Sequence, residues 1–258
     1  MKVLSLFIYI LLFSLFSCNH SAHKKTKNQE ENDSTLTQYI NQGVEYLNEG
    51  EYFKSQIYFD SAKTFSETNS IDTNQIIDLL ISEAELYKKT GDYDKGLSNY
   101  FEALKFSKLT NDSLHTGLSY YNLASIYFYT GKIDESEKYN LKAQKIYSLM
   151  NLSNKLMDSY TQYAVICKSK KEYKKAKSYL KNVINYYQKN NDKQNLSIAL
   201  NNLGNIYFKE NKISEAIKEY KEALKLSKAV GDKYSTAIKY GNIGESYLEI
   251  GDFIISKK

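Results

Sequence analysis

One pattern of residues recurs about every 40 positions along most of this chain, and no other feature of the sequence constrains the fold as strongly. Each copy has an anchor position, and the six anchors are Tyr46, Tyr87, Tyr127, Cys167, Tyr207 and Tyr247. A small residue lies three positions before each anchor: Gly43, Ala84, Ala124, Ala164, Gly204 and Gly244. Another lies nine positions after each of the first five: Ser55, Gly96, Ser136, Ala176 and Ala216. A fixed period of this length predicts a stack of similar supersecondary units.

Each unit has the pattern of two helices joined by a turn. Apolar residues recur three and four positions apart in both halves, and a pair such as Gly91-Asp92 separates the halves. A small residue inside a helix costs stability unless another backbone comes close, so the small residues, Gly241 and Gly244 included, are predicted to mark helix crossings. We therefore predict an all-α fold, an α-solenoid of five full units and a partial sixth over residues 35–258. The predicted boundaries are about 35–70, 71–111, 112–151, 152–191, 192–231 and 232–258.

The best-formed unit carries a family resemblance. Its pattern Leu203-Gly204-x-x-Tyr207, followed by Ala216, Tyr220 and Ala223, resembles the tetratricopeptide repeat. The usual period of that family is about 34 residues. This chain is therefore similar to the longer form found in kinesin light chains, G-protein-signalling modulators and bacterial regulators. The resemblance implies helix–turn–helix units stacked into a right-handed superhelix, and it implies little about function, because these repeats have many unrelated roles.

The N-terminus has the features of an export signal. Residues 3–17 are mostly apolar, and the run is shorter than the roughly 20 residues that a membrane span needs. Leu15-Phe16-Ser17-Cys18 resembles the lipobox of bacterial lipoproteins, which implies removal of residues 1–17, lipidation of Cys18 and a membrane anchor on the periplasmic or outer-membrane side. Residues 18–34 are polar and are predicted to form an extended tether. The alternative is an ordinary signal peptide or an uncleaved anchor.

The chain has no sequence motif of a catalytic or nucleotide-binding site. Apart from His20 and His23 in the predicted tether, its one histidine is His115, which is interpreted as a helix-start residue. Cys167 occupies a position otherwise held by tyrosine, which favours a packing role. All 35 basic residues are lysine, so the planar fork with which arginine recognises phosphates and bases is missing. We therefore predict a protein that is not an enzyme, with no metal, no cofactor and no nucleic-acid partner.

A polar residue lies five positions before every anchor. We call this set the polar column, and it consists of Asn41, Ser82, Asn122, Gln162, Asn202 and Asn242. The first helices of such a stack line its concave side, so the polar column is predicted to face a groove. It resembles the asparagine ladder of the long-period relatives, which implies a grip on the backbone of an extended peptide, because an amide both donates and accepts hydrogen bonds. The alternative is that these residues only solvate one helix face.

Seven lysines crowd the fourth unit: Lys168, Lys170, Lys171, Lys174, Lys175, Lys177 and Lys181. Runs of this kind are mostly solvated faces, and the alternative is a site for an acidic partner or anionic lipid.

These observations predict a non-catalytic, membrane-anchored scaffold that binds protein or peptide segments in its concave groove. The alternative is the sensory part of a longer signalling protein, a sensor histidine kinase or a helix-turn-helix regulator, whose output module is absent. The end of the sequence keeps this alternative open. Gly244 is expected to pack against a further helix, and Phe253 begins that helix but has nowhere evident to pack, so the repeat array reads as cut short at Lys258.

Overall fold

The computed structural model describes residues 27–251, which form helices joined by short turns. The first helices of successive pairs are α2 (Lys27–Glu49), α4 (Thr73–Thr90), α6 (Ser113–Tyr129), α8 (Ser153–Ser169), α10 (Lys193–Lys209) and α12 (Lys233–Glu249). The second helices are α3 (Tyr52–Thr68), α5 (Tyr93–Leu109), α7 (Ile133–Leu149), α9 (Tyr173–Lys189) and α11 (Ile213–Ala229). The predicted all-α solenoid is confirmed, with five helix pairs and a further first helix in this part of the chain.

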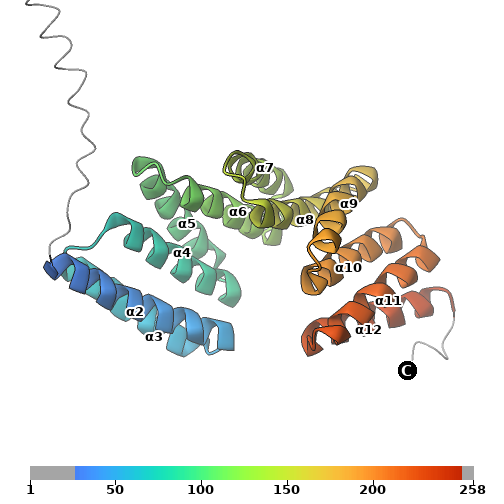
Figure 1. Cartoon of the computed structure of the whole chain (residues 1–258), viewed down its shortest axis with the longest axis horizontal. Coiled ribbons are helices and arrows are strands. Elements are labelled where there is room, and N and C mark those ends of the chain that lie inside the picture. The colour runs from blue at the N-terminus through green and yellow to red at the C-terminus, as the bar shows by residue number, and fades with distance from the viewer. Residues whose placement is uncertain (1–26, 252–258) are drawn as a thin grey trace, which may run out of the picture.

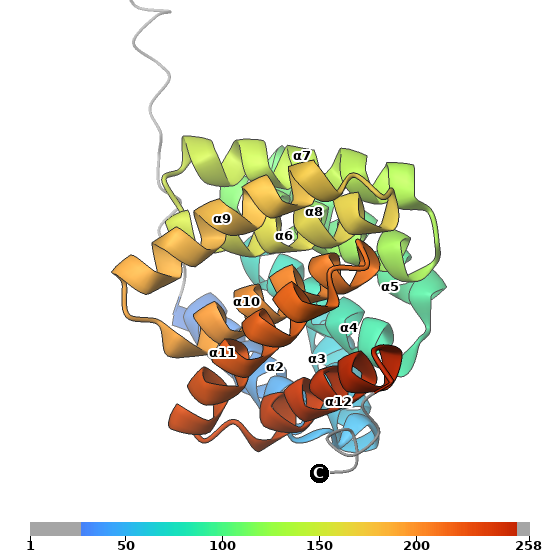
Figure 2. The same cartoon turned by 90° about the vertical axis from the view of Figure 1, so that its right-hand side faces the viewer.

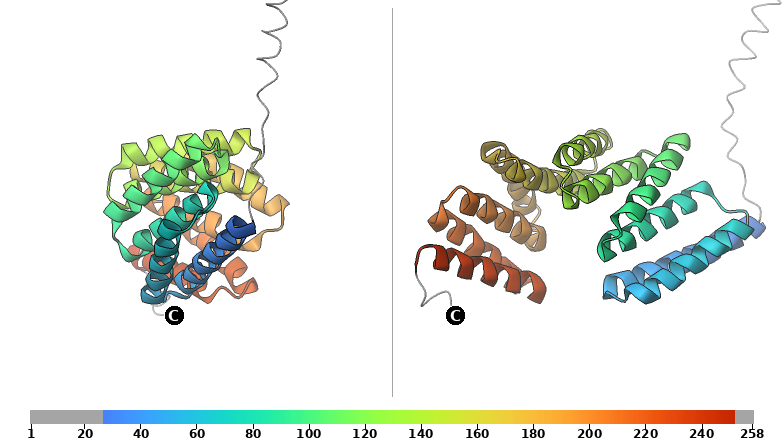
Figure 3. Two further views of the ribbon diagram at one scale, coloured as in Figure 1. Left: turned by 90° about the vertical axis from the view of Figure 1, so that its left-hand side faces the viewer. Right: turned by 180° about the vertical axis from the view of Figure 1, so that it is seen from behind.

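The helix pairs follow one another along an open arc, with α2 and α3 at one end and α11 and α12 at the other (Figure 1). Successive first helices contact each other: α2 with α4, α4 with α6, α6 with α8, and α8 with α10. These helices lie along the inner side of the arc, whereas α7 and α9 lie on its outer side (Figure 1 and Figure 2). Seen from behind, the arc shows α3 in front of α2 (Figure 3). The first helices are therefore the ones that can line a concave surface.

Residues with positive φ end almost every helix. They are Gly50, Gly91, Gly131, Gly231 and Gly251, together with Asn111, Asn151, Lys171, Asn191 and Asn211. Glycine and asparagine adopt this conformation with the least strain, whereas a lysine with φ of 60° at position 171 is unusual. The side chains of Asp92, Asp112, Asp192 and Asp232 then accept a backbone N–H from the first turn of the next helix. These short turns keep the repeat period constant.

Small residues lie where the two helices of a pair cross. A Cβ atom added at Gly43 would lie 2.5 Å from the Phe59 ring, and one added at Gly204 would lie 2.6 Å from the Tyr220 ring. Any side chain at these two positions would therefore displace an aromatic ring of the second helix. Gly241 differs, because a Cβ added there would have no other atom within 4 Å. The helix crossing predicted at Gly241 is therefore wrong.

The anchor tyrosines Tyr46, Tyr87, Tyr127, Tyr207 and Tyr247 are half-buried, whereas Ala216 is fully buried. A lysine lies over each of these rings: the Lys54 ammonium is 5.4 Å from the Tyr46 centroid, and the Lys177 ammonium is 5.2 Å from that of Tyr207. A cation over an aromatic face is attracted by the ring quadrupole. The abundance of tyrosine and lysine therefore has a structural use at the anchor positions, where each half-buried ring has an ammonium group over its face.

Helix α2 begins at Lys27, so the tether predicted for residues 18–34 is wrong over residues 27–34. Asp33 is buried, and its carboxylate accepts the backbone N–H of Asp72 with an N–O distance of 3.1 Å. A contact with the start of α4 thus stabilises a segment that lacks the apolar periodicity of an amphipathic helix. The predictions for Cys18, residues 1–26 and Phe253 lie outside the described residues. Within residues 27–251, no helix has the length and apolar character needed to cross a bilayer.

Candidate functional site

A hollow of about 320 Å³ opens on the inner side of the arc, where α6, α8 and α10 lie side by side. We call it the inner hollow. Its lining consists of Tyr121, Ser125, Phe128, Tyr129, Asp158, Thr161, Gln162, Val165, Tyr187, Asn195 and Ile198. All of these belong to the three first helices except Tyr187, which comes from α9. Three successive helix pairs thus contribute aromatic rings, a carboxylate, amides and hydroxyls to one site.

Asp158 supplies the carboxylate of the inner hollow, and it is open to solvent. The Tyr187 hydroxyl donates to Asp158 Oδ1 with an O–O distance of 3.2 Å. Within residues 27–251, no lysine or histidine nitrogen lies within 4.0 Å of this carboxylate. Desolvation by the surrounding protein raises the pKa of Asp158, and the hydrogen bond from Tyr187 opposes that rise. The inner hollow therefore contains an accessible carboxylate without a cationic partner.

The hydroxyls of Tyr121 and Tyr187 in the inner hollow remain protonated at neutral pH. Burial raises the pKa of Tyr121 to about 12, and burial raises that of Tyr187 as well. A protonated phenol both donates and accepts a hydrogen bond. The two tyrosines can therefore hold a polar group while their rings contact its apolar part.

Some residues of the polar column form hydrogen bonds within the protein, and others form none. Gln162 lies in the inner hollow. Asn122 Oδ1 accepts from the Lys88 ammonium with an N–O distance of 3.1 Å, and Asn242 Nδ2 donates to Asn201 Oδ1 with an N–O distance of 2.8 Å. Within the described residues, no side-chain hydrogen bond is made by Asn41, Ser82 or Asn202. A regular row of free amides is not present, and the role of the polar column in holding a peptide stays a prediction.

A network of buried amides holds Gln162, and its other members are not among the residues predicted from the sequence. Asn140 on α7 is fully buried and donates through Nδ2 to Gln162 Oε1 at 2.7 Å and to the Ser159 carbonyl at 3.0 Å. Gln144 Nε2 donates to Asn140 Oδ1 at 2.6 Å. Gln162 Nε2 in turn donates to Ser125 Oγ at 2.7 Å. A signal did exist in the sequence, because the position of Asn140 in the repeat is occupied by a core side chain in every other full unit: Phe59, Tyr100, Leu180 and Tyr220.

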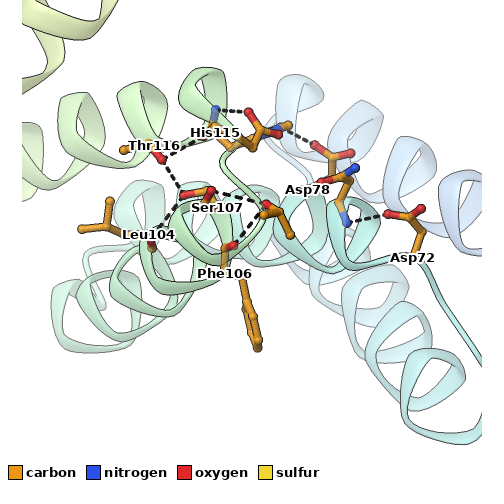
Figure 4. A network of polar contacts seen from close by, with 10 residues as sticks. Asp72, Asp78, Leu104, Phe106, Ser107, His115 and Thr116 are labelled. Atoms are coloured by element: carbon orange, nitrogen blue, oxygen red, sulfur yellow. Dashed lines mark hydrogen bonds and ion pairs between the residues drawn. The ribbon is translucent and has the colours of Figure 1, made fainter. Parts of the chain in front are cut away.

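A charged link joins α4 to α6 next to the turn before α6 (Figure 4). His115 lies in the first turn of α6, and its Nε2 is 2.9 Å from Asp78 Oδ1 of α4. Its Nδ1 contacts Asp112, the N-cap of the same helix. The hydrogen bond to Asp78, followed by that to Asp112, raises the pKa of His115 to about 9 against the opposing effect of burial. His115 is therefore a cation at neutral pH.

Replacing His115 by glutamine is expected to destabilise the protein at acidic and neutral pH but not at high pH. The folded-state pKa lies above the ordinary value of about 6.5, so the stabilisation is complete below that value and is lost as the pH rises through about 9. After allowance for solvent at the exposed Asp78, the cost at about pH 6 should be roughly 1 to 2 kcal/mol. Urea unfolding of both proteins across this pH range measures it. A cost that is the same at high pH would contradict a charged link.

Three of the seven lysines of the fourth unit, Lys170, Lys175 and Lys177, are paired with acidic groups of the protein. The Lys170 ammonium lies 2.6 Å from Glu137, and that of Lys175 lies 3.4 Å from the same carboxylate. The hydrogen bond from Lys170 is the main cause that lowers the pKa of Glu137 to about 2. Lys177 lies 2.6 Å from Glu210. Among residues 27–251, no acidic group lies within 4.0 Å of the other four lysines, Lys168, Lys171, Lys174 and Lys181, so the two interpretations of the cluster both stay predictions.

Cys167 lies in a core cluster with Tyr163 and Leu180 and is fully buried. Burial raises the pKa of its thiol to about 11. A reactive cysteine needs a lowered pKa and access, so these surroundings favour packing over nucleophilic chemistry. Over residues 27–251, no three His, Cys, Asp or Glu side chains are grouped so that they could hold a metal ion.

Comparison with known proteins gives one family. The tetratricopeptide-repeat family model matches residues 75–148, 155–229 and 195–254. Protein KINESIN LIGHT CHAIN-RELATED 3 of Arabidopsis thaliana is 26% identical over 161 residues, which cover 60% of this chain and 25% of that protein. This chain thus spans about a quarter of the length of that relative.

Two solved structures show the likeness of fold. BtubC (BKLC) from P. vanneervenii has a TM-score of 0.61 and 21% identity, with 90% of this chain and 88% of that chain covered. NprR in complex with its cognate peptide NprX has a TM-score of 0.70 and 16% identity, with 98% of this chain and 69% of that chain covered. At these identities the likeness concerns the arrangement of the helices alone.

Proposed function

Because this chain belongs to the tetratricopeptide-repeat family, we propose that it is a non-catalytic scaffold that holds a segment of another protein in the inner hollow. The observation that carries the proposal is the inner hollow itself, to which three successive first helices bring rings, amides and one carboxylate. Hydrogen-bonding groups spaced along successive helices suit an extended chain. The fold of NprR, which holds a peptide, gives a related precedent.

Filling the inner hollow should weaken peptide binding. Short random-sequence peptides displayed on phage would be selected on the full-length chain, and their affinities measured by fluorescence anisotropy. Thr161 lies in the inner hollow, and Thr161→Trp is expected to lower the affinity by about tenfold or more, because the indole occupies the space that the peptide needs. Thr35→Trp is the matched control, since Thr35 on α2 is half-buried like Thr161 and also donates to the carbonyl four residues before it. Equal effects of the two substitutions would contradict the proposal.

We also propose that the scaffold is exported and anchored to a bacterial membrane through Cys18. The lipobox-like residues that precede this cysteine support the proposal. Mass spectrometry of the protein extracted from bacterial membranes is expected to find an acylated Cys18 at the N-terminus and no residues 1–17. Cys18→Ser should abolish the acylation and leave the protein unprocessed. A mature protein that retains Met1 would contradict the anchor.

A further inference from the structure

We propose that the inner hollow selects a segment that carries a primary ammonium group, the side chain of a lysine, and that Asp158 binds this group. The inference rests on the proposed function, since it names the kind of segment that the scaffold holds. Two equivalent aspartates of the molecule support it, because Asp78 has a cationic partner and Asp158 has none.

Asp158 and Asp78 occupy the same position in repeats that are two units apart, and so do Asn195 and His115. In the earlier copy, His115 from the next pair lies 2.9 Å from Asp78 and neutralises it. In the later copy, Asn195 offers no charge, and its Nδ2 donates instead to Asp192 at 2.8 Å. The place that an imidazolium occupies beside Asp78 is therefore taken by a neutral amide beside Asp158. The later carboxylate is left without the cation that the earlier one has.

The charged groups around Asp158 do not supply that cation. Lys155 lies one turn before Asp158 on α8 and favours its ionised form, but the two groups are not within 4.0 Å of each other. Asp192 acts in the opposite direction, because its negative charge raises the pKa of Asp158. A second acidic group so close makes the inner hollow more attractive for a cation. A bound ammonium would satisfy the carboxylate better than any group of the described chain does.

The remaining walls of the inner hollow suit the stem of a lysine side chain. Tyr121, Phe128 and Tyr129 contribute aromatic rings, and Val165 and Ile198 contribute aliphatic surface. Aromatic faces attract ammonium groups, and the apolar surface can cover the methylene chain.

One carboxylate oxygen of Asp158 already accepts the Tyr187 hydroxyl. An arginine guanidinium pairs best with both oxygens of a carboxylate at once, whereas an ammonium is a point charge that needs only one of them. Each oxygen can accept a second hydrogen bond, so the Tyr187 hydroxyl restricts the bidentate pairing of a guanidinium without blocking it, and it constrains least an ammonium, which needs a single acceptor site.

The test uses small probes whose binding does not depend on finding a peptide. The full-length chain would be titrated with n-butylammonium, n-propylguanidinium or 1-butanol, while the methyl signals of Val165 and Ile198 are followed by NMR. Butylammonium is expected to bind about fivefold more tightly than the other two probes. Asp158→Asn should remove this preference. Asp78→Asn is the matched control and should not affect it, because the Asp78 carboxylate is already paired.

A second variant keeps the carboxylate and supplies the cation internally. Asn195→His recreates the Asp78–His115 arrangement at Asp158 and is expected to weaken butylammonium binding about fivefold at about pH 6. Equal affinity for butylammonium and 1-butanol, or an unchanged preference in Asp158→Asn, would overturn the inference. Selected peptides that lack lysine would also overturn it, yet they would leave the scaffold function standing. Tight butylammonium binding in a chain that selects no peptide would overturn the scaffold function, and with it the selection of a lysine-bearing segment, and would leave only the ammonium site at Asp158.

Discussion

Changing Asn140 to aspartate is expected to lower the free energy of unfolding by about 3 kcal/mol at neutral pH, although the two side chains have the same shape. The Asn140 Nδ2 group donates to the Ser159 carbonyl and to Gln162 Oε1, and both of these are acceptors. A carboxylate has no hydrogen to donate, so its oxygens would face two other oxygens in a site with no access to solvent. The same change would also release Gln162, which lines the inner hollow.

The pH dependence separates this cause from a simple loss of packing. A buried carboxyl has a raised pKa in the folded state, so the folded state binds more protons than the unfolded one, and the destabilisation should shrink as the pH falls. Thermal unfolding at about pH 7 and about pH 4 measures the effect. Asn74→Asp is the matched control, because Asn74 is exposed in the first turn of α4 and a negative charge is tolerated there. A loss no larger than that of the control would show that the amide network does not stabilise the fold.

The architecture could be predicted from the sequence because the contacts that define a unit are local. The close approach of Gly204 to Tyr220 joins two helices that a short turn connects, so a fixed spacing in sequence becomes a fixed contact in space. The turns are more local still, because the positive-φ residue that ends one helix lies within two residues of the start of the next helix in most units. Equivalent positions in successive repeats therefore carry similar residues with the same packing role, and this pattern can be recognised in the sequence.

The candidate site could not be read in the same way, because it depends on where the units differ. Asn140 creates the amide network only because one unit replaces a core side chain by an amide. Asp158 lacks the cationic partner that Asp78 has, and Asn195 stands at the position that His115 occupies in that other repeat. The sequence predicts too late a start for α2 for a related reason, because the Asp33 carboxylate accepts the backbone N–H of Asp72, which belongs to the next unit. Each of these contacts depends on which side chain a neighbouring unit places beside the residue. The residues found at one repeat position do not give that information.

Replacing Gly204 by leucine is expected to destabilise the protein by roughly 2 to 3 kcal/mol, even though leucine is the better helix former. The added Cβ alone would lie 2.6 Å from the Tyr220 ring, and the rest of the side chain would have no space between α10 and α11. Tyr220 is buried, and its hydroxyl donates to Asn205 Oδ1, so the ring cannot turn away without losing that hydrogen bond.

The same substitution at Gly241 should have the opposite sign. Gly241 is exposed in the middle of α12, and an added Cβ meets no other atom there, so leucine gains about 0.8 kcal/mol of helix propensity without overpacking. Urea unfolding of the two variants gives the comparison directly. In a Tyr220→Ala background the cost of Gly204→Leu should fall by about 1 kcal/mol or more, because the opposing ring is gone. If the cost were unchanged in that background, the requirement for glycine at this crossing would have to come from the backbone, since the ring would no longer account for it.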